Sequence, residues 1–186
     1  MFEDRRSKRI VLVAHCVLNQ NAKIDRCAHY PGAMREVARV LLDSDVGIVQ
    51  MPCPELVCLG LDRQANRGAA ATVESEDTRV ALRMSEGAAG VACGDMAAGL
   101  VQQAKDYRKH GFEIVGVVGI NGSPTCGVET TWRSDREARG PGVFIQKLAE
   151  GLEAEGIPIA MRGIKAREPD SAVAAVKELL AEPPAN

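Results

Sequence analysis

The stretch RIVLVAHC, residues 9–16, contains an uninterrupted apolar run and ends at a cysteine. Two later stretches have the same form: GIVQM at residues 47–51 leads to Cys53, and IVGVVGI at residues 114–120 leads to Cys126. Short apolar runs that alternate with amphipathic stretches predict βαβ units and a mostly parallel sheet. Ligands bind in such sheets outside the carboxyl ends of the strands. We therefore expect Cys16, Cys53 and Cys126 to lie near one edge of the sheet.

The rest of the chain continues this pattern and predicts an α/β fold, a central sheet flanked by helices. We expect strands at about 9–14, 47–51, 112–120 and 157–161, and helices at about 32–42, 77–109, 143–155 and 170–181. Glycines predict an interruption in the long third helical region. Segments 56–72 and 126–141 are expected to be loops. The fold is Rossmann-like but lacks the Gly-x-Gly-x-x-Gly dinucleotide fingerprint. Residues 1–186 are expected to form one domain with a core at about 9–181.

Composition narrows the class of partner. The 186 residues carry a net charge of −2 and are 46% hydrophobic and 3% aromatic. This composition is typical of a soluble globular protein and gives no electrostatic footprint for nucleic acid. Neither a signal peptide nor a membrane span is expected from the N-terminal sequence, so we expect a cytoplasmic location and no membrane partner. Oligomeric state is not readable from these features.

Six cysteines in a reducing compartment favour metal binding or catalysis over disulfides. Each cysteine alone has an easy structural explanation, because free cysteine is often buried as a small hydrophobe. Cys93, inside an expected helix, fits that explanation. The three that follow strands instead suggest a metal or iron–sulfur centre, and thiolate ligands suit both zinc and an iron–sulfur cluster. Three protein ligands would leave one iron open to substrate.

Several polar residues flank these cysteines, and each has a functional and a structural interpretation. Glu55 is a candidate general acid or base, or a salt-bridge partner of Arg63. Ser123 could contact substrate or cap its own turn. His15 could donate a proton or be a satisfied core histidine. Three amide side chains could hold substrate by hydrogen bonds or form an Asx-type turn: Asn19, Gln20 and Asn21.

The three cysteine motifs together resemble the 2-thiouracil desulfurase family. HCVLNQN at 15–21 and QMPCPE at 50–55 are most similar to a related branch of desulfidases, and SPTCG at 123–127 supplies the third motif. The similarity runs from about 9 to 163. It implies a 4Fe–4S cluster bound by Cys16, Cys53 and Cys126, with zinc as the second candidate.

The same resemblance implies a small thiolated molecule as substrate. The sulfur of a thiocarbonyl group would bind the open iron and leave as hydrosulfide, replaced by water without redox change. Glu55 would activate the water, and Ser123 would bind substrate or relay a proton. A free base, a nucleoside or a small thioamide all remain candidates. The competing hypothesis is a non-catalytic metal-binding or redox-sensing domain, in which Cys27 or Cys58 resolves a disulfide.

Overall fold

The computed structural model describes residues 4–24, 27–64 and 72–182, and in it four strands form one parallel sheet. Their order across the sheet is β2 (Gly47–Gln50), β1 (Arg9–Val13), β3 (Glu113–Ile120) and β6 (Met161–Ile164). Every neighbouring pair runs parallel, with Leu12 opposite Val49 on one side and Val117 on the other. The predicted α/β class is confirmed.

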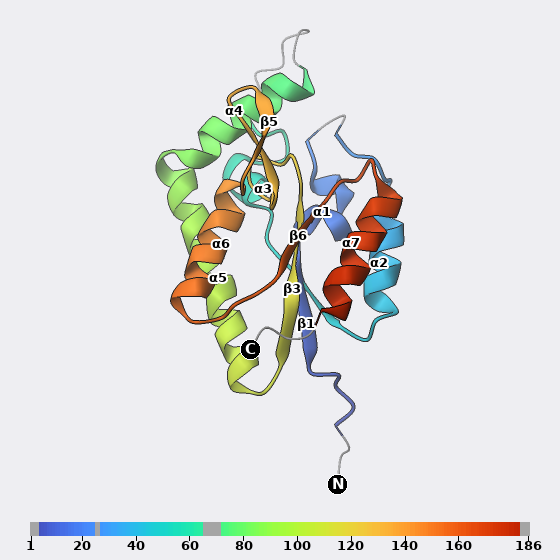
Figure 1. Cartoon of the computed structure of the whole chain (residues 1–186). Coiled ribbons are helices and arrows are strands. Elements are labelled where there is room, and N and C mark those ends of the chain that lie inside the picture. Colours follow the sequence, from blue (N-terminus) through green and yellow to red (C-terminus); the bar gives the residue numbers. More distant parts are fainter. Residues whose placement is uncertain (1–3, 25–26, 65–71, 183–186) are drawn as a thin grey trace.

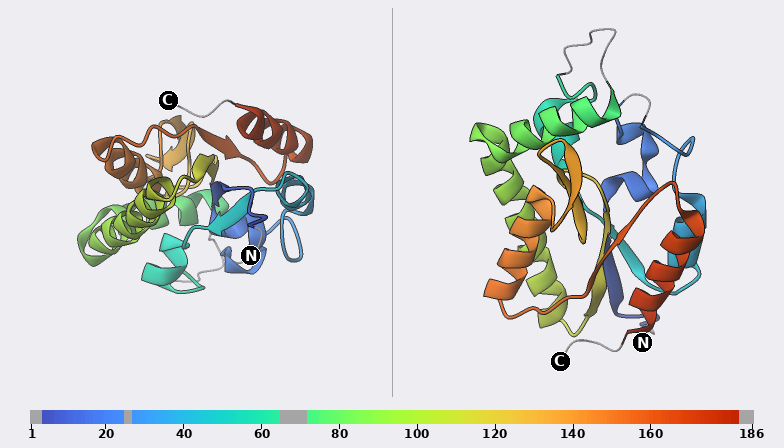
Figure 2. Two further views of the ribbon diagram at one scale, coloured as in Figure 1. Left: turned by 90° about the horizontal axis from the view of Figure 1, so that it is seen from below. Right: turned by 45° about the horizontal axis from the view of Figure 1, so that its top comes forward.

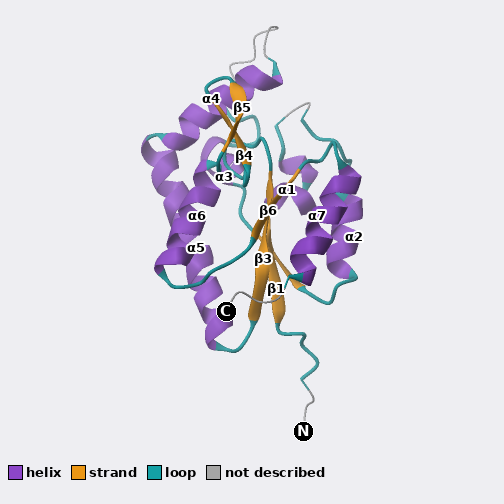
Figure 3. Ribbon diagram, in the orientation of Figure 1, coloured by secondary structure: helices purple, strands orange, loops and turns teal. Residues whose placement is uncertain are grey.

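Helices cover both faces of this sheet, as Figure 3 shows. On one side α2 (Arg35–Leu42) packs against α7 (Pro169–Ala181), and on the other α5 (Gly87–Lys109) packs against α6 (Val143–Ala154). Figure 1 shows the two pairs flanking the strands. Strands buried on both faces must be apolar at successive positions. Val11, Leu12 and Val13 are accordingly at most 1% exposed.

The remaining elements gather at the carboxyl end of the sheet, which comes forward on the right of Figure 2. They are α1 (His15–Leu18), the 3₁₀ turn η1 (Gln20–Ala22), α3 (Pro54–Leu59), α4 (Val73–Ser85) and the antiparallel pair β4 (Thr130–Arg133) and β5 (Arg136–Arg139). The sheet therefore presents its carboxyl edge to a layer of short segments.

Two predicted loops contain regular structure. Segment 56–72 overlaps α3, because Pro54 occupies the first helical turn, where its missing N–H costs nothing. Segment 126–141 contains the β4–β5 hairpin, whose turn residues Ser134 and Asp135 have positive φ of 53° and 62°. Two such residues make the tight turn that matches strand twist, but Ser-Asp lacks the usual Asn-Gly signal.

The fourth strand was predicted too early in the chain. Ile157 donates its N–H to Leu152 and so finishes α6, and the following Pro158 has no N–H to offer a sheet. Pairing with β3 starts only when Val117 donates to the Ala160 carbonyl. The predicted interruption of the long helical region is confirmed: α4 ends at Ser85 and α5 begins at Gly87, which has a φ of +51°.

None of the described helices is both long and apolar enough to cross a membrane.

Candidate metal and catalytic site

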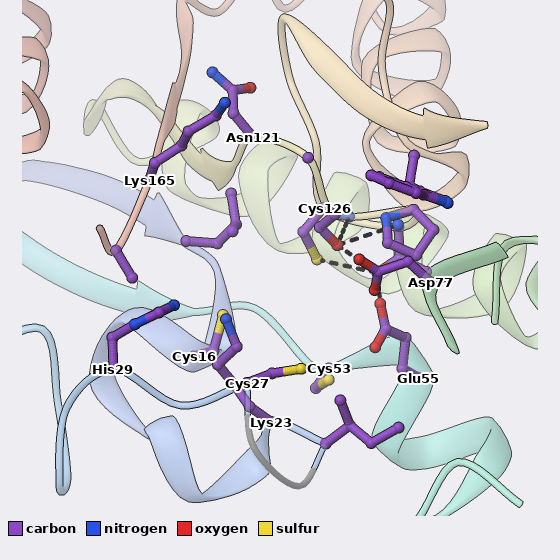
Figure 4. Close-up of a pocket in the computed structure, with 18 of the residues that line it drawn as sticks. Cys16, Lys23, Cys27, His29, Cys53, Glu55, Asp77, Asn121, Cys126 and Lys165 are labelled. Carbon is purple, nitrogen blue, oxygen red and sulfur yellow. Dashed lines mark hydrogen bonds between the residues drawn. The ribbon is translucent and has the colours of Figure 1, made fainter. Parts of the chain in front are cut away.

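Three strand ends deliver one cysteine each to a single cavity. Cys16 lies in the first turn of α1 directly after β1, Cys53 is the N-cap of α3 after β2, and Cys126 follows β3. All three line a cavity of about 360 Å³, shown in Figure 4. That volume falls in the range of small-molecule sites. The structure thus brings together the three cysteines singled out from the sequence, while their role as ligands stays a prediction.

The turn that carries Cys126 folds back onto the end of β3. Ile120 donates its N–H to the Cys126 carbonyl at 2.7 Å. A Cβ atom on Gly119 would lie 2.5 Å from that carbonyl oxygen, so only glycine allows the close approach. The Ser123 hydroxyl oxygen accepts the N–H groups of Thr125 and Cys126 at 3.2 and 3.0 Å. Ser123 therefore caps its own turn and also lines the cavity.

A chain of polar contacts connects Cys53 to Cys126 through a buried arginine. Arg63, 1% exposed, donates Nε to Glu55 Oε2 at 3.2 Å and places Nη2 3.7 Å from Cys53 Sγ. Thr125 Oγ1 donates to the other Glu55 oxygen at 2.7 Å and lies 3.6 Å from Cys126 Sγ. Glu55 is therefore the salt-bridge partner of Arg63, and it also lines the cavity, where a general acid or base would have to lie.

The electrostatic surroundings disfavour the thiolate form of the three cysteines. Burial raises the pKa of Cys16, and the nearby Lys23 ammonium opposes this. Burial, followed by the Glu55 carboxylate, raises the pKa of Cys53 to about 12. The pKa of Cys126 is raised well above its ordinary value by burial and then by Cys53 and Cys16. The sulfur atoms are therefore near enough to interact, and a bound cation would be needed to keep all three ionised.

The spacing of these groups bears on which metal they fit. Among the described residues, no three His, Cys, Asp or Glu side chains are grouped closely enough to hold a single ion. A zinc site needs each sulfur about 2.3 Å from one centre, whereas cysteines on a cluster bind different irons and stand further apart. Within the described residues the three thiols share a cavity without forming a single-ion site, and the group that they would hold stays a prediction.

Four residues that the sequence suggested for substrate binding are not part of the cavity lining. His15, Asn19, Gln20 and Asn21 are all described, and none is among the residues lining the cavity. Asn19 caps η1 by accepting the Asn21 N–H, and its Nδ2 lies 3.3 Å from His15 Nε2. Gln20, 1% exposed, donates to the Cys16 carbonyl at 2.6 Å and accepts from the backbone of His29. These side chains hold the turn behind Cys16, because α1 starts immediately after the strand and rotates them away.

The comparisons with known proteins place the chain in a family. No protein-family model matches it. It is 32% identical over 123 residues to the uncharacterized protein MJ0003 of Methanocaldococcus jannaschii, across 66% of this chain and 70% of that protein. The chain belongs to the same family as MJ0003. Among solved structures, TudS, named as a 4Fe-4S-dependent thiouracil desulfidase, is similar over 91% of this chain and 99% of its own, at 18% identity and a TM-score of 0.44. A likeness this low carries no argument about function.

In this member of the MJ0003 family, the cavity lining includes residues that had not been singled out from sequence as parts of the site, among them Lys23, Asp77, Trp132 and Lys165. Trp132, the single tryptophan of the sequence, reaches the cavity from β4 and donates its indole N–H to Thr78 of α4 at 2.7 Å. Sequence gives little signal for these residues because they lie outside the three cysteine motifs and reach the cavity only through the tertiary structure.

We expect replacement of Arg63 by methionine to lower the free energy of unfolding by about 3–5 kcal/mol. The guanidinium is the partner of Glu55 and donates to the carbonyls of Ala22, Gly60 and Leu61. The change therefore leaves several buried acceptors without a hydrogen bond. Urea unfolding measures the loss. The exposed Lys105–Glu155 pair supplies the control, because Lys105→Met should cost under about 1 kcal/mol. Equal losses in the two variants would contradict the role given to Arg63.

Proposed function

We propose that this protein is an iron–sulfur-dependent desulfidase that converts a thiocarbonyl compound and water into the carbonyl compound and hydrosulfide without net redox change. The observation that carries the proposal is the meeting of Cys16, Cys53 and Cys126 at one cavity beside a charged Glu55–Arg63 pair. The resemblance of the three cysteine motifs to desulfidases supports the same assignment. A cluster held by Cys16, Cys53 and Cys126 would supply an open iron, whose chemistry would be that of a Lewis acid towards the carbon–sulfur bond.

In this proposal Glu55 removes a proton from the attacking water. Arg63 and Thr125 each donate a hydrogen bond to one of its oxygens, at 3.2 and 2.7 Å, so the carboxylate is held in place. Since Thr125 belongs to the turn of Cys126 and Glu55 to the helix after Cys53, the base is fixed relative to two of the proposed ligands.

Ser123 is proposed to bind the substrate. Its oxygen accepts two backbone N–H groups, so its hydroxyl proton remains available for donation, with Thr125 Oγ1 at 3.3 Å as one acceptor. Trp132 offers an aromatic surface on the same cavity, and stacking on it suits a planar heterocycle. A thiolated base, its nucleoside or a thioamide fit this chemistry.

The alternative of a redox-sensing domain has less support. A sensor needs an accessible thiol with a lowered pKa, but burial raises the pKa of both Cys27 and Cys58. Cys58 also lies outside the described lining of the cavity, with its Sγ 4.0 Å from the Ala89 carbonyl. It is therefore poorly placed to resolve a disulfide with Cys53.

Anaerobic reconstitution with iron and sulfide, followed by metal and sulfide analysis, tests the cofactor. We expect about four irons and four sulfides per chain, the content of one cubic cluster. The reconstituted protein is then given thiouracil, thiouridine and simple thioamides, and sulfide release is followed. One zinc and no acid-labile sulfide would refute the cluster, and a full cluster with no sulfide released from any of these compounds would refute the activity.

A further inference from the structure

Besides Glu55, other carboxyl groups line the cavity: Glu74, Asp77, Glu137 and Glu168. Asp77 projects from α4, and Figure 4 shows it on the same wall of the cavity as Glu55. Thr72 and Ser75 form a capping box at the start of α4. The hydrogen bond from Trp132 to Thr78, the residue after Asp77, also fixes the helix to the β4–β5 hairpin.

The carboxyl groups of Glu55 and Asp77 have opposite surroundings. Glu55 is hydrogen-bonded by Arg63 and Thr125, whereas no hydrogen bond or ion pair to the Asp77 carboxyl is found within the described residues. The neighbouring Glu76 is already bound by Arg79 at 2.6 Å. The charged and titratable groups that face Asp77 are Glu55 of α3, Glu74 and Glu76 of its own helix, Lys23 after η1, and Cys27.

Burial, followed by repulsion from the Glu55 carboxylate, raises the pKa of Asp77 to about 7, and only Lys23 acts strongly in the other direction. Asp77 can therefore hold a proton near neutral pH on the same cavity as Glu55, and carboxyl groups in different surroundings are the arrangement that divides acid and base roles.

Building on the proposed function, we propose that Asp77 is the proton donor of the site, while Glu55 is the base. Water oxygen bonds to the thiocarbonyl carbon as Glu55 takes one water proton, and Asp77 gives its proton to the sulfur. The carbon–sulfur bond then breaks, and hydrosulfide leaves with the bonding electron pair. The proton of the added hydroxyl returns to Asp77 as the carbonyl forms, and the proton on Glu55 passes to solvent. No electron donor or acceptor is required.

The test compares Asp77→Asn with wild type and with Asp95→Asn, an exposed aspartate on α5 outside the described cavity lining. Iron content and cluster absorbance should be the same in all three proteins. We expect Asp77→Asn to reduce kcat/KM at least about 100-fold near neutral pH and to abolish the fall in wild-type rate above about pH 7. Asp95→Asn should leave both rate and pH profile unchanged.

Thermal unfolding of the full chain gives a readout that does not depend on activity. Asp77 binds its proton more tightly in the folded protein than in the unfolded chain, so wild-type stability falls relative to the variant as pH rises from about 4 to about 7. We expect Asp77→Asn to melt several degrees above wild type at pH 8.5, with the difference shrinking towards pH 5.

Three results would overturn the proposal. A variant that keeps the full rate with a full cluster removes Asp77 from the mechanism and leaves the proposed function intact. A variant that is inactive but shows no pH-dependent gain in stability means that Asp77 is not protonated in the folded protein. A wild-type protein that carries the cluster and releases no sulfide refutes the proposed function and the donor role together.

Discussion

Replacement of Cys16 by alanine is expected to remove the iron–sulfur cluster and all sulfide release. Cys16 follows β1 in the first turn of α1 and lines the cavity with Cys53 and Cys126. Of the three proposed ligands only Cys53 and Cys126 would remain, too few for a cluster that already lacks its fourth protein ligand, while Cys27 also lines the cavity but is not a proposed ligand. After anaerobic reconstitution, iron should fall from about four per chain to below one, and the visible absorbance of the cluster should vanish.

The matched control is Cys58→Ala, which removes a partly buried thiol on α3 that lies outside the described lining of the cavity. This variant should retain the full iron content and activity. A Cys16 variant that still binds about four irons would contradict the proposed ligand set. A Cys58 variant that loses the cluster would show that iron binding depends on other thiols than those at the strand ends.

Replacement of Glu55 by glutamine is expected to lower turnover by about 10²–10⁴-fold with the cluster intact. The three cysteines are untouched, and the amide oxygen can still accept a hydrogen bond from Thr125. Glutamine cannot take a proton from water, so the attacking nucleophile is no longer activated. Sulfide release from the reconstituted variant, normalised to iron content, measures the loss.

Two controls isolate the chemical effect of that change. Glu150→Gln alters an exposed carboxylate on α6 and should leave turnover unchanged. A thermal melt of the Glu55 variant reports how much stability is lost when Arg63 no longer faces a charge. If the variant is folded, carries its cluster and turns over at the wild-type rate, Glu55 is not the base, and Asp77 and Ser123 become the groups to examine.

Sequence predicted the parallel sheet and the edge at which the site lies. The strands at 9–13 and 113–120 contain long apolar runs because helices cover both faces, and this burial leaves a continuous signal in the sequence. The edge strand at 47–50 is only partly buried and has a shorter apolar run. Parallel strands bring their carboxyl ends to a common edge, so the cysteines that follow them had to approach one another. The later strand was misplaced because its four residues carry only a weak apolar signal.

The composition of the cavity wall was decided by the tertiary structure. Asp77 and Trp132 arrive from α4 and β4, segments whose local sequence is typical of an ordinary helix and a loop. The side chains of Asn19 and Gln20 likewise form hydrogen bonds to the backbone of the turn around Cys16 and do not line the cavity. Whether a polar side chain serves a site depends on what packs beside it in space. That neighbourhood arises from contacts between segments tens of residues apart, as between Glu55 and Thr125, and no local pattern encodes it.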